Sequence, residues 1–337
     1  MSETGILPDR DIEALWQSKA LSAMAPPLAN QIQPASLDLR LGDVAYRLRA
    51  SFLPGEKRSV AECLTRGDLV MHEVDLRGGA VLETGCVYLA PLQEMMALPD
   101  GISAAMNPKS STGRLDVFTR VIVDHSAAFD QAPAGYAGPL YVEICPRTFS
   151  ILARPGDRLV QARFRKGDRQ ALRDITVSVD LQAGDGPIGY RARRYSGVVD
   201  LDGVGQHDAA DYWEPVFAPK GRLVLDPGEF YILASCEAVE IPMNQAAEMA
   251  PVAPEIGEFR AHYAGFFDPG FGLAEAGGTG GRAVLEVRGR DVPFLIEHGQ
   301  PVARLVFEPM TEMPSRPYGA SGSHYQAQKL KLAKHFR

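Results

Sequence analysis

Short apolar runs, each bounded by Gly, Pro or Asp, recur along the whole sequence and predict strands joined by turns. Residues 36–42 alternate apolar and polar side chains and end in glycine, a pattern typical of a half-buried strand. Residues 140–144 and 283–287 are short β-rich runs with a glutamate inside each. Residues 158–164 and 301–307 have the same character. The pattern therefore predicts a mostly-β protein.

One helix is predicted near the start of the chain, with Asp9 as its N-cap. Its apolar face would consist of Ile12, Leu15, Trp16 and Ala20. The last residues, 329–337, are basic, and we expect them to form a solvated tail.

The sequence repeats itself at one constant offset. Residues 81–89 match residues 224–232, and the same spacing of 143 residues relates Glu143 to Glu286. One offset held over so many positions indicates an internal duplication. We predict two modules, residues 1–167 and residues 168–337. The polar stretch 166–215 would supply the connection and the first strands of the second module.

Composition narrows the function classes. The 337 residues carry 35 Lys plus Arg against 42 Asp plus Glu, a net charge of −7, which argues against sequence-independent nucleic-acid binding. An apolar content of 45% is enough for a core, and no apolar run approaches the ~18 residues that span a bilayer. The N-terminus has no signal-peptide pattern, and none of the four cysteines forms a C-x-x-C pair. We expect a cytoplasmic protein, no membrane contact, and cysteines that are small buried hydrophobes.

The segment Lys109-Ser110-Ser111-Thr112-Gly113-Arg114 combines three hydroxyls, a glycine and two cations. Hydroxyl and backbone N–H groups can bind phosphate oxygens, and the cations offset their charge. The second copy lacks this cluster, because residues 252–257 read Val-Ala-Pro-Glu-Ile-Gly. A requirement of the fold would have persisted in both copies. We therefore interpret residues 109–114 as a polyphosphate-binding turn.

Four carboxylates stand in pairs at matching places of the two copies. Glu143 and Glu286 lie inside apolar strands, where each is either a solvent-facing residue or a buried general base. Asp130 and Asp268 each follow a phenylalanine in a hairpin ahead of a glutamate strand. Such an aspartate either forms the turn, or it accepts a hydrogen bond from a sugar hydroxyl while the phenylalanine packs beneath the sugar ring.

These motifs occur in a characteristic order. Residues 35–42 (Ala-Ser-Leu-Asp-Leu-Arg-Leu-Gly) are followed by Ser110-Ser111-x-x-Arg114, a Gly-rich hairpin and Val142-Glu143. Near the C-terminus, Arg316-Pro317-Tyr318 precedes His324-Tyr325-x-x-Gln328. In this order and in its tail the chain resembles the dCTP deaminase family, relatives of the trimeric dUTPases. The resemblance covers nearly the whole chain, in two modules.

The resemblance implies two tandem dUTPase-like distorted β-barrels of jelly-roll type with a few short helices. It also implies hydrolytic deamination of dCTP to dUTP and ammonia. Glu143 or Glu286 would take a proton from the water that attacks C4, and Arg114 would orient the base or stabilise charge on it.

The remaining site residues follow from the same resemblance. Lys109, Ser110 and Ser111 would hold the triphosphate, with Mg²⁺ bound through the phosphates rather than in a protein cage. Tyr318, His324 and Gln328 would close over the nucleotide. No protein-bound metal is expected, because the H-x-E and P-C-x-x-C elements of zinc deaminases are absent.

The sequence leaves several alternatives open. The chain could hydrolyse dUTP to dUMP and pyrophosphate, alone or after deamination, or it could be a nucleotide-binding regulator. Family sites combine the loop of one module with the hairpin and glutamate of its neighbour. We favour a composite site within one chain that joins the Arg114 loop to Asp268 and Glu286. The rival places Asp130 and Glu143 against the loop of another chain in a homo-oligomer.

Overall fold

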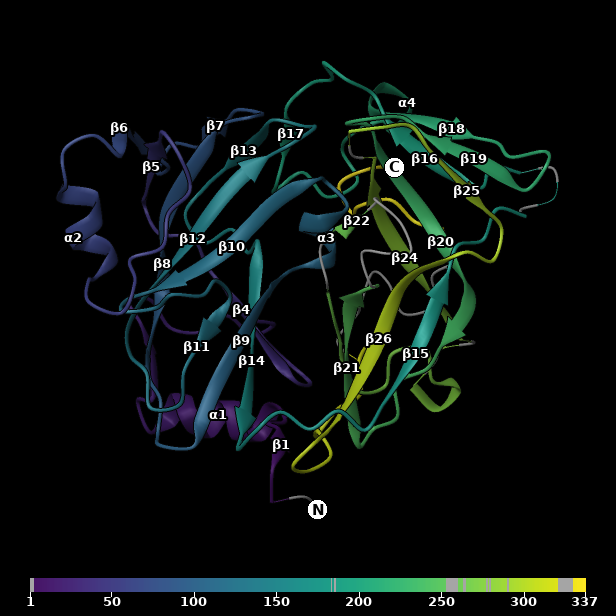
Figure 1. Cartoon of the computed structure of the whole chain (residues 1–337). Coiled ribbons are helices and arrows are strands. Elements are labelled where there is room, and N and C mark those ends of the chain that lie inside the picture. Colours follow the sequence, from purple (N-terminus) through teal and green to yellow (C-terminus); the bar gives the residue numbers. More distant parts are fainter. Residues whose placement is uncertain are drawn as a thin grey trace.

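Two halves built from small β-sheets lie side by side, the first in purple to teal and the second in teal to yellow (Figure 1). The structure, a computed structural model, describes residues 3–337 apart from 183, 185, 253–259, 263, 264, 277, 279, 290 and 321–329. Strands outnumber helices among these residues, which confirms the mostly-β prediction. The predicted module boundary falls in the connection between a strand that ends at Lys166 and one that begins at Arg173.

The first half contains two main sheets and a smaller one. Its strands are β1 (Gly5–Ile6), β2 (Leu21–Ala23), β3 (Ile32–Gln33), β4 (Ser36–Leu39), β5 (Val44–Leu48), β6 (Val70–Asp75), β7 (Ala80–Leu82), β8 (Val87–Ala97), β9 (Ile102–Pro108), β10 (Val117–Val123), β11 (Gln131–Ala132), β12 (Ala137–Pro146), β13 (Ile151–Ala153) and β14 (Val160–Lys166). One sheet has the order β11-β9-β14-β4-β3 with β1 beside β14, and the other has the order β10-β12-β8-β5-β6 with β2 beside β8. The small sheet has the order β17-β13-β7, in which β17 (Val199–Asp200) comes from the second half and pairs in parallel with β13.

The second half repeats this arrangement. Its strands are β15 (Arg173–Ser178), β16 (Gly189–Ala192), β17 (Val199–Asp200), β18 (Trp213–Val216), β19 (Arg222–Leu225), β20 (Phe230–Val239), β21 (Gln245–Pro251), β22 (Arg260–His262), β23 (Phe266–Phe267), β24 (Gly281–Arg288), β25 (Phe294–Glu297) and β26 (Pro301–Pro309). The orders β15-β26-β21-β23 and β18-β16-β20-β24-β22 match the two main sheets of the first half, and β19-β25 matches β7-β13. The duplication inferred from the sequence is thus a duplication of sheets.

The helices are short. They are α1 (Asp9–Gln17), α2 (Val60–Thr65), α3 (Ser110–Gly113) and α4 (Ala209–Tyr212), with a 3₁₀ turn at Ala274–Ala276. The expected cap of α1 is wrong, because Pro8 occupies the N-cap position and Asp9 is the first helical residue. The Asp9 carboxylate instead accepts hydrogen bonds from the backbone N–H and the hydroxyl of Ser315, so it ties the helix to the far end of the chain.

Strand β4 is fully buried, whereas its alternation predicted a half-buried strand. Its polar side chains are compensated inside the protein. Ser36 donates to Asp268 of the second half, Asp38 pairs with Lys109, and the next polar residue, Arg40, pairs with the buried Glu94. Buried polar groups with such partners avoid most of the desolvation penalty. The alternation of apolar and polar residues therefore does not indicate a solvent-exposed face in this strand.

The C-terminal segment is docked, which corrects the expected solvated tail. The Phe336 ring packs 5.2 Å from Tyr212 and 5.8 Å from Trp213, between ring centroids. His335 is buried with its Nε2 3.2 Å from the Leu201 carbonyl oxygen. Tyr212, Trp213 and Ala333 belong to the same apolar core as the first-half strands, so the core is continuous across the two halves.

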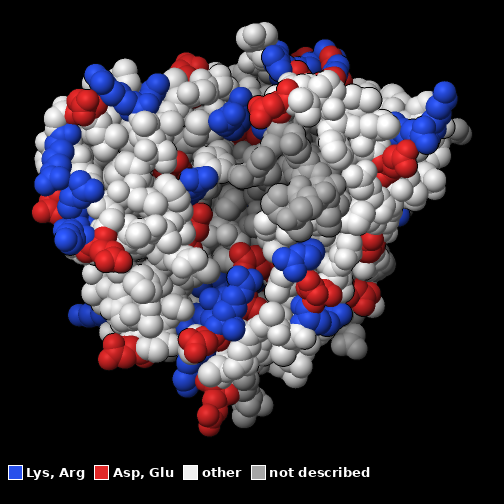
Figure 2. Space-filling model, viewed as in Figure 1, with Lys and Arg blue, Asp and Glu red and all other residues white. Residues whose placement is uncertain are grey.

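On the face drawn in Figure 2, Lys and Arg side chains intermingle with Asp and Glu side chains instead of gathering by sign. Within the described residues, none of the helices has the length and apolar character needed to cross a bilayer.

Candidate active site

The turn that carries Ser-Ser-x-x-Arg lies between the two halves (Figure 1). It folds as the short helix α3, in which the N–H of Gly113 donates to the Lys109 carbonyl and the N–H of Arg114 to the Ser110 carbonyl. Residues of this turn face two cavities. Ser110 and Arg114 line the first, and Lys109, Ser111 and Thr112 line the second.

Arg114 meets a glutamate of the second half. Its Nε lies 3.7 Å from Oε1 of Glu286 on β24, and both side chains are almost completely buried. Burial raises the pKa of Glu286 to about 8, even though the Arg114 charge lowers it. Arg114 also donates from Nη1 to the carbonyl of Lys331 at 3.1 Å. A buried carboxyl with a pKa near neutrality can both accept and return a proton.

The first cavity, about 40 Å³, is built from both halves. The first half supplies Ser110 and Arg114, and the second half supplies Asp268, Glu286 and an aromatic wall. The wall consists of Phe267, Phe271 and Tyr318, with 5.2 Å between the first two ring centroids and 5.6 Å between the last two. Such a wall suits a flat ring held beside the carboxylate.

Asp268 is fixed from the opposite half. Arg163 of β14 donates from Nη2 to Oδ1 at 2.8 Å, and Ser36 donates to Oδ2 at 3.2 Å. The Arg163 guanidinium also lies 4.0 Å from the ring centroid of Phe266. Strands β4 and β14 of the first half therefore fix the position of Asp268 in the hairpin of the second half.

The second cavity, about 380 Å³, lies on the other side of α3. Lys109, Arg158 and Lys334 bring three cationic side chains to it. Asp38 is paired with Lys109 and lies 3.3 Å from Arg158. The pKa of Lys334 is lowered by burial and by the charges of Lys109 and Arg158. Asp157 and Asp202 also line this cavity, so its charge is mixed. The three cations, beside backbone and hydroxyl donors, can bind an anion.

Family models cover the chain from end to end. The N-terminal domain model of 2'-deoxycytidine 5'-triphosphate deaminase matches residues 3–168, and the C-terminal domain model matches residues 154–336. The chain belongs to the dCTP deaminase family.

Individual relatives agree with this assignment. A crystal structure titled 2'-deoxycytidine 5'-triphosphate deaminase from Agrobacterium tumefaciens is 54% identical, with a TM-score of 0.88, and the match covers 92% of this chain and 100% of that one. A Beutenbergia cavernae protein named "dCTP deaminase, dUMP-forming" is 32% identical over 195 residues, which are 56% of this chain and 94% of the relative. A Haloarcula marismortui protein named "dCTP deaminase" is 33% identical over 136 residues, 40% of this chain and 66% of the relative.

Neither carboxylate of the first half lines the cavity that contains Arg114. Glu143 faces Arg120 across the β10–β12 pair and Leu89 across the β12–β8 pair. Leu89 packs with Val60, so helix α2 covers this side of the sheet. Burial raises the pKa of Glu143, whose Oε2 is buried without a hydrogen-bond partner among the described residues.

Asp130 adopts a left-handed backbone conformation, with φ of 61°, and its Oδ1 accepts a hydrogen bond from the Val121 N–H at 2.7 Å. Burial raises its pKa to about 7. Arg120 lies between the rings of Phe118 and Phe129, 4.6 Å and 4.5 Å from their centroids. Within one chain the structure thus brings Glu286 and Asp268, rather than Glu143 and Asp130, to the Arg114 turn.

His324 and Gln328, like most of the second copy's counterpart of the turn, lie outside the described residues. The Thr112 hydroxyl donates to the Leu159 carbonyl at 2.7 Å, so it already has a structural partner.

Sequence reasoning missed Ser36, Arg163, Arg158 and Lys334 as neighbours of the two cavities. For Lys334 the signal is the basic C-terminal run, which by composition alone predicts a solvated tail. Ser36 lies within the motif of residues 35–42. No local motif distinguishes Arg163 and Arg158 from ordinary strand and loop residues, because the fold alone brings them to the site.

Proposed function

We propose that the chain deaminates dCTP to dUTP and ammonia, with Glu286 as the general base and without zinc in the reaction. The observation that carries the proposal is the buried contact between Arg114 of one half and Glu286 of the other, in a chain of the dCTP deaminase family. The names of the relatives, which specify dCTP as substrate, support the choice of nucleotide.

In this mechanism cytosine lies against the aromatic wall of the first cavity. The Glu286 carboxylate takes a proton from a water molecule, and the resulting hydroxide adds to C4. Glu286 passes this proton to N3 of the ring, then takes the proton of the C4 hydroxyl and delivers it to the departing amine. The C4–N bond breaks, ammonia leaves, and C4 retains the oxygen as a carbonyl. Arg114 stabilises the negative charge that develops during addition.

The triphosphate would lie along α3 toward the second cavity. Ser110 and Ser111 would supply hydroxyls, and Lys109, Arg158 and Lys334 would offset the phosphate charge. Mg²⁺ would enter as part of the nucleotide complex, with water and phosphate oxygens as its main ligands. Asp268 would accept a hydrogen bond from the sugar.

Product analysis tests the proposal directly. Incubation with dCTP and Mg²⁺ should release ammonia and dUTP in equal amounts. Tight binding of dCTP without turnover would overturn the proposal and support a regulator with a degenerate site.

A second candidate is a bifunctional enzyme that also hydrolyses dUTP to dUMP and pyrophosphate. It is favoured by the words "dUMP-forming" in the names of several relatives, including that from Beutenbergia cavernae. Formation of dUMP and pyrophosphate together with ammonia would establish it. Hydrolysis of added dUTP at the same rate would show that the second step does not require the first.

A further inference from the structure

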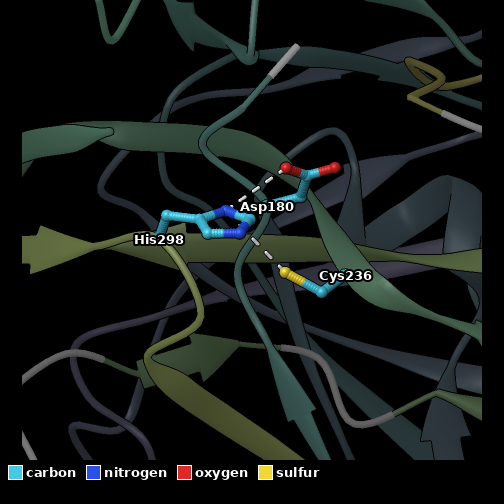
Figure 3. Close-up of side chains that lie close together, drawn as sticks. All are labelled: Asp180, Cys236 and His298. Atoms are coloured by element: carbon cyan, nitrogen blue, oxygen red, sulfur yellow. Dashed lines mark hydrogen bonds and ion pairs between the residues drawn. The ribbon is translucent and has the colours of Figure 1, made fainter. Parts of the chain in front are cut away.

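Three side chains with metal-binding atoms meet in the second half, and none of them lines either cavity of the candidate active site. Figure 3 shows the imidazole of His298 between the carboxylate of Asp180 and the thiol of Cys236. One potential ligand atom from each residue lies within 4.8 Å of the other two. Asp180 follows β15, His298 follows β25, and Cys236 lies in β20 where its pairing with β24 is interrupted.

The spacing of these atoms suits a small cation. The His298 Nδ1 is 3.5 Å from Asp180 Oδ1 and 4.0 Å from Cys236 Sγ. A tetrahedral Zn²⁺ with bonds of about 2.0–2.3 Å holds its ligand atoms roughly 3.3–3.6 Å apart. All three atoms lie within 4.8 Å of one another, so movements of about 1 Å would bring them to these spacings. We propose that Asp180, Cys236 and His298 bind Zn²⁺ or a similar thiophilic divalent cation, with water as the fourth ligand.

The present partners of the three side chains are compatible with this role. The Leu181 N–H donates to His298 Nδ1 at 3.2 Å, and a cation bound at this atom would displace that long hydrogen bond. The Cys236 thiol donates to the Val179 carbonyl at 3.2 Å, and it would release its proton on binding. Arg282 pairs with Oδ2 of Asp180, while Oδ1 accepts a hydrogen bond from the Gln182 N–H at 2.9 Å and faces the imidazole. Such a partner orients a ligating carboxylate.

The duplication supplies an internal comparison. In the second half the N–H of Asp180 donates to Ala234, and in the first half the N–H of Gly42 donates to Pro91 in the same way. The Cys236 thiol donates to the carbonyl of the residue before Asp180, just as the Gln93 amide donates to the carbonyl of the residue before Gly42. The counterpart of His298, at the spacing of 143 residues, is Pro155.

The first half thus builds the same backbone frame with Gly, Gln and Pro, none of which offers a favourable zinc ligand. The second half has three ligand-type side chains at the corresponding place. Cys236 is also only partly buried and His298 is exposed, so a cation in solution can reach both. An accessible carboxylate, thiol and imidazole at one place are the ligand types that Zn²⁺ prefers.

Zinc titration of the full chain tests the site. After treatment with EDTA, the wild type should bind one equivalent of Zn²⁺ in competition with a chromophoric chelator, and Co²⁺ should give a thiolate-to-metal charge-transfer band. Cys236→Gln installs the residue of the first half, so the fold is preserved, and it should weaken Zn²⁺ binding by about 100-fold or more and abolish the band. Cys86→Ser, at another partly buried cysteine, is the matched control and should bind normally.

Thermal unfolding gives a second measurement. Saturating Zn²⁺ should raise the Tm of the wild type by a few degrees and leave that of Cys236→Gln unchanged, because the cation binds only the folded state. Failure of the wild type to bind Zn²⁺, or unchanged binding in Cys236→Gln and in His298→Gln, would overturn the proposal. Deamination of dCTP by Cys236→Gln should remain at the wild-type rate. The zinc site is tested by binding and the proposed function by product analysis, so either proposal can fail without the other.

Discussion

Arg163 of the first half and Asp268 of the second form an ion pair in which the Nη2–Oδ1 distance is 2.8 Å and both side chains are almost fully buried. The pair joins the two halves directly beneath the first cavity, since Asp268 lines that cavity. Arg163 lies on β14, and Ser36, the other partner of Asp268, lies on β4. These two strands pair in one sheet, so a sheet of the first half supports the hairpin of the second.

Arg163→Ala should lower the free energy of unfolding by about 3–5 kcal/mol, because it leaves the Asp268 carboxylate buried without its main counter-charge. Urea unfolding followed by circular dichroism would measure the change. The control is Arg222→Ala, which breaks an exposed pair with Glu297 and should cost no more than about 1 kcal/mol. Equal effects of the two substitutions would contradict a supporting role for Arg163.

Arg114→Ala should reduce kcat by about 100-fold or more, as expected for removal of a group that stabilises charge in the transition state. Ser111→Ala should act mainly on nucleotide binding, by about 1–2 kcal/mol for one lost hydrogen bond to a charged group. Steady-state kinetics with dCTP would separate the two effects. If both variants kept the wild-type kcat and KM, the Ser-Ser-x-x-Arg turn would not be part of the site.

Glu286→Gln and Glu143→Gln form a matched pair, because each replaces a buried strand carboxylate with an isosteric amide that cannot act as a base. We expect Glu286→Gln to abolish deamination while it still binds dCTP, and Glu143→Gln to retain most activity. The opposite result would move the site to the first half and would require a second chain to supply the Arg114 loop. In that case the specific activity should fall on dilution.

The raised pKa of Glu286, about 8, predicts the pH dependence of the reaction. A general base must be deprotonated, so kcat/KM should rise with pH, by about tenfold per unit well below the pKa, and level off above about pH 8. A flat profile between pH 6 and roughly 8 would exclude Glu286 as the base with this pKa.

The same shift affects stability. The folded state keeps a proton on Glu286 that the unfolded state loses near its ordinary pKa of 4.5. Stability from this group is therefore present below about pH 4.5 and is lost as pH rises toward 8, by at most about 1.4 kcal/mol per pH unit. Relative to wild type, Glu286→Gln should become more stable as pH rises through this window, which thermal melts at a series of pH values would show.

Deamination should survive a zinc-selective chelator and fall in EDTA only as Mg²⁺ is removed from the nucleotide. Added Mg²⁺ alone should restore the rate. Loss of activity on zinc removal, with recovery on zinc addition, would place zinc in the reaction and contradict the Glu286 mechanism.

The sequence was most informative where one residue type recurs at one spacing. Alternation and turn residues predicted strands correctly, and the constant offset predicted the repeated sheets. The choice between Glu143 and Glu286 could not be made from either pattern, because both lie in equivalent strands. The choice depends on which glutamate strand faces α3. That is a contact between distant parts of the chain, since Arg114 and Glu286 are 172 positions apart.

Burial of polar residues was harder to predict. Asp9 was expected to cap a helix, and instead bonds to Ser315, about 300 residues away. The cysteine expectation holds for Cys63 and Cys145, which are buried, but not for Cys86 and Cys236, which are partly exposed. Asp180, Cys236 and His298 are too far apart in sequence to form a recognisable metal motif, and only the sheet arrangement brings them together.

Strand β4 has a consequence for how the chain finds its fold. Its polar side chains, with that of Arg40, face partners in three different places, while Leu37, Leu39 and Leu41 face the apolar core. A slip of one residue would exchange the two faces, driving charges into the core and leaving Lys109, Glu94 and Asp268 opposite leucines. Misaligned pairings of β4 with β14 are therefore strongly penalised. The buried polar groups thus fix the register of β4. Formation of the sheet then also fixes the positions of α3 and of the hairpin of the second half, which these groups contact.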